Sequence, residues 1–423
     1  MAQSTHLNSE RRISSRPMGL WFALLLLFAG AFLRCPPILI HGRVWAEESS
    51  VFLIHSWNVP FFTVLLAPQF GYFSIWDNFF AAVAVHGVPL TMVALLFTWS
   101  AVLLLLVTGY FIYQAEFLVT RAAKTAGVLA LLLTPPCIEP WLNLINSEFY
   151  FGIFAAVILL SNASRLRIPR NLGLAVAVLS GPLTTLLAPF FVLRSLVRRR
   201  RDEMVQAVVV CVGALLQVGT ALTTTTANRI VHFNPLTIGP VLFNKQFVFL
   251  FLNRLVAKVI YLVLLNRFHF STATLLATWF AVIVGVGGLL YLLRRQRTAQ
   301  LLLLTALWLA LLESSLALDG GLNHVGPGGG ERYAFTPNVL IELAIVAAAF
   351  AITATWRRTT ARVLLALAFF SGAVDYLLLP LRTKSAYQGE PWRQQVLRWE
   401  RDPATPLKPS PTGWPAFHLP SKK

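Results

Sequence analysis

The sequence predicts an all-α polytopic membrane protein with about nine to eleven transmembrane helices. Of the 423 residues, 57% are hydrophobic and the mean hydropathy is +0.67, which is more apolar surface than a soluble core of this size buries. Apolar stretches of about twenty residues, the length that crosses a bilayer, recur along most of the chain. They are continuous and lack the alternation of a membrane β-barrel, so the predicted spans are helices.

Short basic runs beside the apolar stretches predict the topology, because such runs mark cytoplasmic loops. They are Arg11, Arg12 and Arg16; Arg165, Arg167 and Arg170; Arg198–Arg201; Arg294, Arg295 and Arg297; and Arg357, Arg358 and Arg362. Topology and attraction to anionic lipids account for the net charge of +18. No nucleic-acid-binding module accompanies the runs, so we expect membrane lipids and no nucleic acid as partners.

With the basic runs inside, the apolar segments alternate in direction. The segments that leave the cytoplasm are 20–40, 126–138, 205–222, 301–318 and 363–379. The segments that return to it are 89–112, 149–160, 272–293 and 337–354. The chain divides into a cytoplasmic tail (1–19), a transmembrane domain (20–380) and a short extracytoplasmic tail (381–423). An uncleaved first helix fits better than a signal peptide, since no small-residue cleavage site follows it.

Three segments are not simple spans. Residues 41–88 form the first outer loop, where aromatic residues alternate with polar groups as in interfacial helices. Residues 171–197 have basic runs at both ends and a central Gly181-Pro182, which predicts a re-entrant pair or two short helices. Residues 223–270 are expected outside, as a loop with interfacial helices and room for one hairpin.

Two adjacent carboxylates, Glu47 and Glu48, directly follow the first span, although charged residues make up only 12% of the chain. They are either an acidic loop that orients the first helix or a catalytic centre at the membrane surface. Neighbours in an extended loop point apart, so only one of them is expected to be central, and Glu47 is the better candidate. Functional groups are therefore expected on the outer side of the membrane, where most other acidic residues also fall. These residues are Asp77, Glu139, Glu148, Asp319, Glu331, Glu390, Glu400 and Asp402.

Sugar transfer from a lipid phosphate to a hydroxyl fits this placement. A carboxylate takes the proton of the attacking hydroxyl, cations stabilise the leaving phosphate, and an apolar groove holds the lipid tail. The sequence supplies Glu47 or Glu48 as the base, and Arg332 with Lys245 and Arg254 as outer cations. Aromatic interfacial segments supply apolar surface.

Several segments together carry a family resemblance. They are residues 41–53 with Gly71-Tyr72, residues 146–150, residues 179–182, residues 331–338, and the tail with Trp392, Trp399 and residues 411–415. The set resembles the bacterial membrane glycosyltransferases of the GT-C superfamily, which use polyprenyl-phosphate sugars and carry a catalytic acidic residue in the first outer loop. The chain departs from that pattern at Glu48 and Ser49, where Asp and Gly are common.

The resemblance implies an inverting glycosyltransferase in a bacterial inner membrane. The enzyme would move a sugar from a polyprenyl-phosphate donor to an envelope glycan or lipid acceptor on the extracytoplasmic face. Glu47 or Glu48 would be catalytic; Arg332, Tyr333, Lys245 and Arg254 would contact the donor phosphate; Trp45, Tyr72, Asn146 and Glu148 would line the site. A structural role is the alternative for these residues. Arg and Tyr at a helix end anchor the helix at the membrane interface, and an Asn-x-Glu sequence commonly begins a helix.

Two other functions stay open. A transporter or flippase of lipid-linked sugars would use intramembrane charges such as Glu313 or Glu342, although no internal repeat is visible. A non-catalytic membrane assembly subunit could share the motifs. No ligand spacing indicates a metal site, so the cofactor is unknown and Mg²⁺ is only compatible with the chemistry. The sequence does not indicate the oligomeric state.

Overall fold

The computed structural model describes residues 17–136, 138–162, 166–224, 234–316, 321–387 and 390–420. The chain is mostly helical (76%), and seven helices in its described part are long and apolar enough to cross a membrane. They are Leu90–Gln114, Arg201–Thr223, Pro235–Asn266, Thr272–Leu293, Arg297–Leu316, Arg332–Ala351 and Thr355–Leu377. Met18–Arg34 and Ser147–Leu160 are shorter apolar helices. The predicted all-α, multi-pass membrane class is confirmed.

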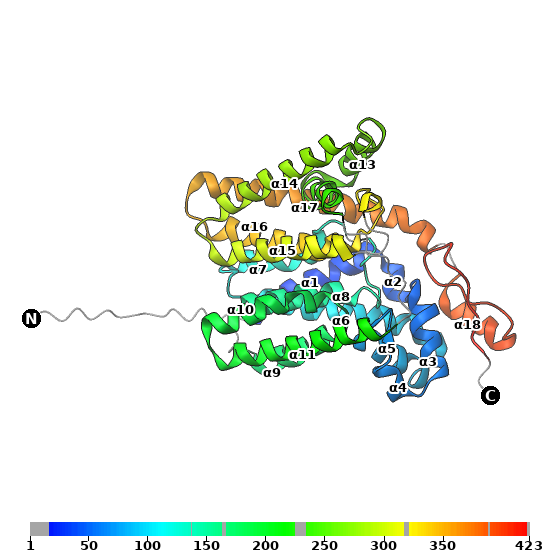
Figure 1. Cartoon of the computed structure of the whole chain (residues 1–423). Coiled ribbons are helices and arrows are strands. Elements are labelled where there is room, and N and C mark those ends of the chain that lie inside the picture. The colour runs from blue at the N-terminus through cyan, green and yellow to red at the C-terminus, as the bar shows by residue number, and fades with distance from the viewer. Residues whose placement is uncertain are drawn as a thin grey trace, which may run out of the picture.

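The elements follow one another as a helical bundle with a small layer of short elements at one end (Figure 1). The N-terminal part contains α1 (Pro17–Arg34), α2 (Pro36–His41), the π-helix η1 (Glu48–Leu53), α3 (Ile54–Asn58), α4 (Phe61–Leu65), strands β1 (Pro68–Gln69) and β2 (Tyr72–Phe73), and α5 (Ile75–His86). The two strands pair antiparallel, with Gln69 opposite Tyr72.

The remaining elements are η2 (Leu90–Met92), α6 (Val93–Gln114), α7 (Arg121–Leu133), α8 (Ser147–Leu160), α9 (Arg167–Val178), η3 (Leu183–Leu187), α10 (Ala188–Arg198), α11 (Arg201–Thr223), α12 (Pro235–Leu242), η4 (Phe243–Phe249), α13 (Leu250–Asn266), α14 (Thr272–Leu293), α15 (Arg297–Leu316), η5 (Gly321–His324), α16 (Arg332–Ala351), α17 (Thr355–Tyr387) and α18 (Trp392–Arg401). Helix α16 is almost wholly buried and packs against α7, α8, α15 and α17, so it is the centre of the bundle.

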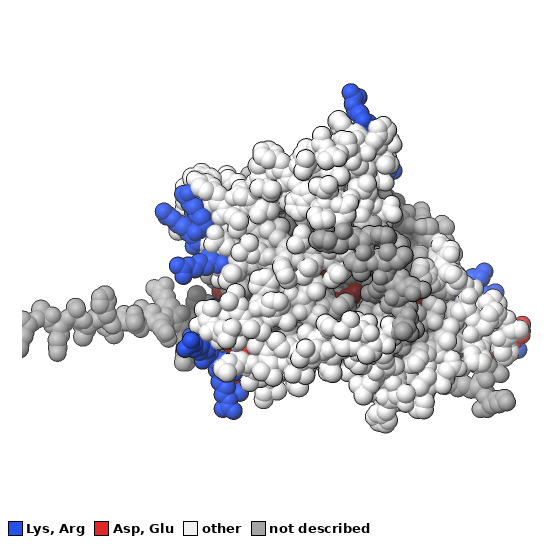
Figure 2. Space-filling view, viewed as in Figure 1, with Lys and Arg blue, Asp and Glu red and all other residues white. Residues whose placement is uncertain are grey.

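The two ends of the bundle differ in character. The connections α10/α11, α14/α15 and α16/α17 carry basic runs and lie at one end, which we call the basic end (Figure 1). Figure 2 shows Lys and Arg side chains gathered there. The opposite end holds α2–α5 and α18 and is called the site end (Figure 1). This segregation is the one that the basic runs predict.

The first apolar segment is shorter than predicted. The sequence predicts a span over 20–40, but α1 ends at Arg34 and α2 begins at Pro36. Cys35 precedes a proline and takes non-helical angles (φ −157°, ψ 80°), because a residue before proline is disfavoured in the α conformation. Arg34 is fully buried, with its guanidinium 4.3 Å from the centre of the Trp141 ring. A cation–π contact thus accommodates a charge within the bundle.

The segment 171–197 is two short helices, one of the two forms predicted. Helix α9 and helix α10 flank a break at Gly181, whose φ of +136° suits glycine. A Cβ at Gly181 would lie 2.6 Å from Glu148. The break therefore brings the chain close to the start of α8.

The segment after α11 folds into a hairpin. The apolar stretch Pro235–Asn266 is long enough to span, but Asn253 interrupts it with φ +76° and ψ 171°. Asn244 Nδ2 donates to the Ala257 carbonyl at 3.2 Å, so the two arms lie side by side. The hairpin is one of the forms predicted for this segment, and Asn338 and Ser371 donate to carbonyls of its first arm, those of Lys245 and Phe249.

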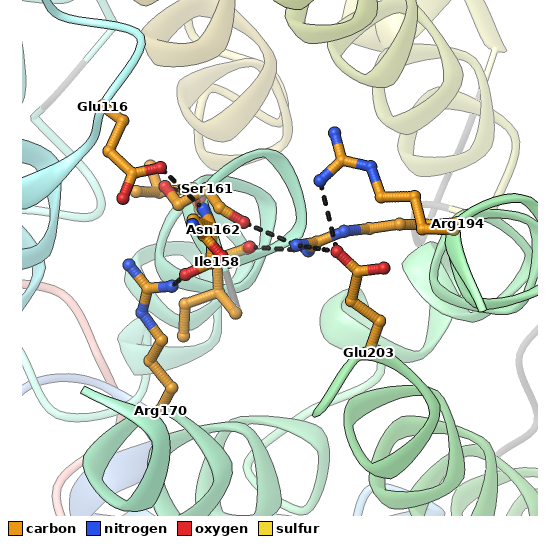
Figure 3. Close-up of polar contacts among 9 residues, drawn as sticks. Glu116, Ile158, Ser161, Asn162, Arg170, Arg194 and Glu203 are labelled. Atoms are coloured by element: carbon orange, nitrogen blue, oxygen red, sulfur yellow. Dashed lines mark hydrogen bonds and ion pairs between the residues drawn. The ribbon is translucent and has the colours of Figure 1, made fainter. Parts of the chain in front are cut away.

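Helix α8 is fixed at its basic end by two arginines (Figure 3). Arg194 donates to the carbonyls of Ile158 and Ser161 at 3.0 and 2.5 Å, and Arg170 donates to the carbonyl of Asn162. Cations suit the end of a helix, where backbone carbonyls lack partners. Glu203 binds Arg194 at 3.0 Å and ties α11 to the same point. The opposite end of α8 carries site residues, so these contacts help to set their position.

The C-terminal tail, predicted as a short extracytoplasmic segment, is folded onto the loop that follows the first apolar segment (residues 41–88). Its apolar residues Trp392, Val396, Trp399, Leu407, Phe417 and Leu419 pack with Val44, Phe52, Leu53 and Val93. Ser410 bridges the loop on both sides of Trp45, accepting from Ala46 N–H at 2.5 Å and donating to the Val44 carbonyl at 2.8 Å. The tail thus contributes to the site end.

Candidate functional site

Two cavities meet at Glu47 and Arg332. Cavity A, about 260 Å³, is lined by Glu47, Phe70, Tyr72, Ile145, Asn146, Glu148, Phe149, Pro182, Leu183, Leu186, Glu313, Leu316, Arg332 and Tyr333. Cavity B, about 310 Å³, is lined by Trp45, Ala46, Glu47, Ile138, Glu139, Arg254, Gly328, Glu331, Arg332, Pro411 and Trp414. Among the described residues, only Glu47 and Arg332 belong to both linings, so they lie between the two cavities.

Most residues that the sequence singles out line these spaces. Cavity A brings together Glu47, Tyr72, Asn146, Glu148, Arg332 and Tyr333, and cavity B adds Trp45 and Arg254. They come from the first loop, β2, the start of α8, the α13 arm of the hairpin and the start of α16. Glu48 and Lys245 are in neither lining.

The two adjacent carboxylates lie at a helix start that follows a tight turn, and successive residues of a helix face different directions. Ala46 has φ +39°, a left-handed conformation that is uncommon for a residue with a side chain, and a π-helix begins at Glu48. Glu47 is half-buried and faces both cavities, whereas Glu48 is fully buried. The sequence predicts an extended loop; a turn and a helix start produce the separation instead.

Glu48 holds the first loop against the segment before α8. Its carboxylate accepts from the backbone N–H groups of Leu144, Ile145 and Trp45, the last two at 3.2 and 2.6 Å. Burial raises the pKa of Glu48 to about 7, against the lowering effect of these bonds and of Arg43. The contacts make Glu48 an anchor of the loop that carries Glu47.

Stability is expected to depend on the protonation of Glu48. The folded-state pKa of Glu48, about 7, lies above the ordinary 4.5. The contribution of Glu48 to the free energy of unfolding is therefore complete below pH 4.5 and is lost as the pH rises to 7. The loss amounts to about 3 kcal/mol. The unfolding temperature of the wild type should fall more steeply from pH 5 to pH 7 than that of Glu48→Gln, whose amide oxygen still accepts from Leu144. Equal slopes in the two proteins would contradict this.

Arg332 and Tyr333 begin α16 at the rim of cavity A. Arg332 Nη1 lies 3.0 Å from Glu139 Oε1, and 25% of its side chain is exposed. Its guanidinium carbon is 5.1 Å from the centre of the Tyr333 ring, and His324 stacks on that ring at 5.7 Å. A guanidinium held beside an aromatic ring, on a side chain that is partly exposed, can bind phosphate oxygens.

Lys245 and Arg254, for which the sequence predicts a phosphate contact, bind the glycine-rich loop formed by residues 326–331. Lys245 Nζ donates to the carbonyls of Gly326 and Gly329, both at 2.8 Å. Arg254 pairs with Glu331 and, at 2.7 Å, with Asp375. Both side chains are buried. Because the loop runs directly into Arg332, the two cations position that residue.

Asp77 is a second buried carboxylate, and it lies beside the start of α8. Ser147 Oγ donates to Asp77 Oδ1 at 2.9 Å, which joins α5 to α8. Burial, together with the nearby Glu148 and Glu48, raises the pKa of Asp77. This contact fixes the turn of α8 from which Glu148 reaches cavity A.

Sequence reasoning missed several lining residues. Glu313 was considered only for transport, yet it lines cavity A, and Trp414 of the tail lines cavity B. Glu139 pairs with Arg332 across 193 positions of sequence, a separation that no local pattern reveals. Only the rarity of charge in apolar sequence could have pointed to Glu313.

The described residues contain no group of three or more His, Cys, Asp or Glu side chains that could hold a metal ion. Comparisons with family models, curated proteins and solved structures find no match to the chain.

Proposed function

We propose that this protein is a membrane glycosyltransferase that moves a sugar from a polyprenyl-phosphate donor to a glycan or lipid acceptor. The observation that carries the proposal is the position of Glu47 and Arg332 between two cavities. A group-transfer enzyme needs two substrates to meet at one point, with a base and an anion-stabilising group there. A resemblance of the first loop to GT-C enzymes agrees with this.

The two linings suit different substrates. Cavity A has an apolar wall of Phe70, Leu183, Leu186 and Leu316 beside its polar groups, as a lipid-linked donor requires. Cavity B has two indole rings, Trp45 and Trp414, together with charged groups. Aromatic rings beside polar groups suit a sugar acceptor, because such rings combine apolar and polar contact.

The chemistry follows from this assignment. The acceptor hydroxyl in cavity B attacks the anomeric carbon of the donor sugar, and Glu47 takes the hydroxyl proton. The bond from that carbon to the phosphate oxygen breaks, and the electron pair leaves with the phosphate. Arg332 stabilises the charge on the leaving phosphate, and its ion pair with Glu139 is replaced by this contact. Attack opposite the leaving group inverts the anomeric configuration. By the resemblance, the site end faces the extracytoplasmic side of a bacterial inner membrane.

Arg332→Gln tests the phosphate contact. The variant is expected to bind polyprenyl phosphate about 10- to 100-fold more weakly than the wild type, since a hydrogen bond to a charged group contributes about 1.5–3 kcal/mol. Its affinity for the uncharged polyprenol should not change. Titration with each lipid, followed by tryptophan fluorescence of the purified protein, measures the difference.

The matched control is Arg167→Gln, which removes an arginine paired with Asp202 at 2.8 Å at the basic end. It should bind both lipids as the wild type does. If the wild type failed to prefer polyprenyl phosphate over polyprenol, the proposed donor would be wrong.

A further inference from the structure

Glu313 differs from the other buried carboxylates of the described chain. It lies on α15, is 5% exposed, and neither Oε1 nor Oε2 has a hydrogen-bond partner among the described residues. The others have partners: Glu48, Asp77, Glu203, Glu331, Glu342 and Asp375 bind backbone N–H groups, hydroxyls or arginines. Burying a carboxylate without a partner is costly, so the missing partner of Glu313 needs an explanation.

The position of Glu313 supplies the explanation, because its side chain lines cavity A. It stands three positions before Leu316, at the end of α15 that reaches the site end. A ligand in this cavity would meet an acceptor that the described residues do not satisfy. Such a ligand must carry hydrogen-bond donors at that point.

The other polar groups of cavity A narrow the ligand class. Glu148 adds a carboxylate, and Asn146 and Tyr72 add groups that can both donate and accept. A volume of about 260 Å³ is smaller than the usual 300–1,000 Å³ of sites for drug-sized ligands, so it suits a single sugar ring. Hydroxyl groups around such a ring are donors of the kind that Glu313 lacks among the described residues.

We propose that Glu313 is a donor-recognition residue that accepts hydrogen bonds from hydroxyl groups of the sugar in cavity A. The inference rests on the proposed function and deepens it, because it assigns the sugar, and not only the phosphate, to this cavity. Glu313 binds the sugar and takes no part in proton transfer. The substrate hydroxyl groups then supply the hydrogen-bond donors that Glu313 lacks among the described residues.

The first test needs no ligand. Glu313→Leu removes an unpartnered buried carboxylate and should raise the apparent Tm of the detergent-purified protein by about 1–4 °C. Glu342→Leu is the matched control on α16, because Glu342 is equally buried but accepts from Thr134 Oγ1 at 2.7 Å. Glu342→Leu therefore removes a hydrogen bond, which Glu313→Leu does not, and it should lower Tm. A fall in Tm for Glu313→Leu would overturn the inference, because it would show a structural role.

The second test measures the sugar itself. In a Glu47→Gln background, where turnover is blocked, mass spectrometry gives the ratio of lipid-linked sugar to bare polyprenyl phosphate retained by the protein. Adding Glu313→Leu should lower that ratio at least about tenfold, the loss expected for a hydrogen bond to a charged group, and adding Glu342→Gln should not.

The outcomes separate the two proposals. An unchanged ratio with Glu313→Leu would overturn the role of Glu313 and leave the proposed donor intact. Absence of lipid-linked sugar from the Glu47→Gln protein itself would overturn the proposed function and, with it, the assignment of a sugar to cavity A.

Discussion

Glu47→Gln is expected to lower the rate of sugar transfer by about 10²- to 10⁴-fold, the usual contribution of a general base. Glutamine matches glutamate in shape but cannot take the proton of the acceptor hydroxyl. Within the described chain the Glu47 side chain makes no hydrogen bond or ion pair and lines both cavities, so the unfolding temperature should stay close to that of the wild type. Transfer of labelled sugar in membranes from cells that produce each variant measures the effect.

Glu48→Gln is the matched control for this result. Its amide oxygen can still accept from Leu144 and Ile145, so most of the activity should remain. A variant pair in which Glu48→Gln lost activity and Glu47→Gln kept it would reverse the assignment of the base. Full activity in both variants would exclude catalysis by either carboxylate.

Arg254→Met is expected to have the largest effect on stability, lowering the free energy of unfolding by about 3–5 kcal/mol. The change leaves Glu331 and Asp375, both buried, without the arginine that binds them. Thermal unfolding in detergent measures the loss. Activity should fall as well, since the glycine-rich loop before Arg332 loses a hydrogen bond to the Pro327 carbonyl.

Two further variants test this explanation. Arg167→Met breaks an ion pair whose arginine side chain is 46% exposed, and exposed pairs contribute only about 0–1 kcal/mol. The triple variant Arg254→Met, Glu331→Gln, Asp375→Asn removes the uncompensated charges and should recover part of the stability. If it were no more stable than Arg254→Met alone, buried charge would not be the cause.

The sequence predicted the class of fold because apolar length and basic runs are local properties. It could not place the end of α1 at Arg34, although Pro36-Pro37 is a visible break, because the apolar run continues beyond it. The reversal at Asn253 was also hidden, since a left-handed residue within a helical pattern has no strong signal.

The candidate site was partly visible in sequence. Glu47, Arg332 and Glu148 stand out because charge is rare beside apolar segments. The roles of Lys245 and Arg254 depend on the hairpin that brings them to the loop at Gly326–Glu331. Trp414 reaches cavity B only because the tail pairs with the first loop at Ser410. Such long-range pairings cannot be derived from one sequence.

Mass spectrometry of the lipids retained by the purified protein tests the central proposal most directly, with the wild type and Glu47→Gln side by side. We expect bare polyprenyl phosphate on the wild type and a polyprenyl-phosphate hexose or pentose enriched on the variant, because the donor binds but cannot react. Only bulk phospholipid on both proteins would contradict a glycosyltransferase. It would favour the transporter or the assembly subunit.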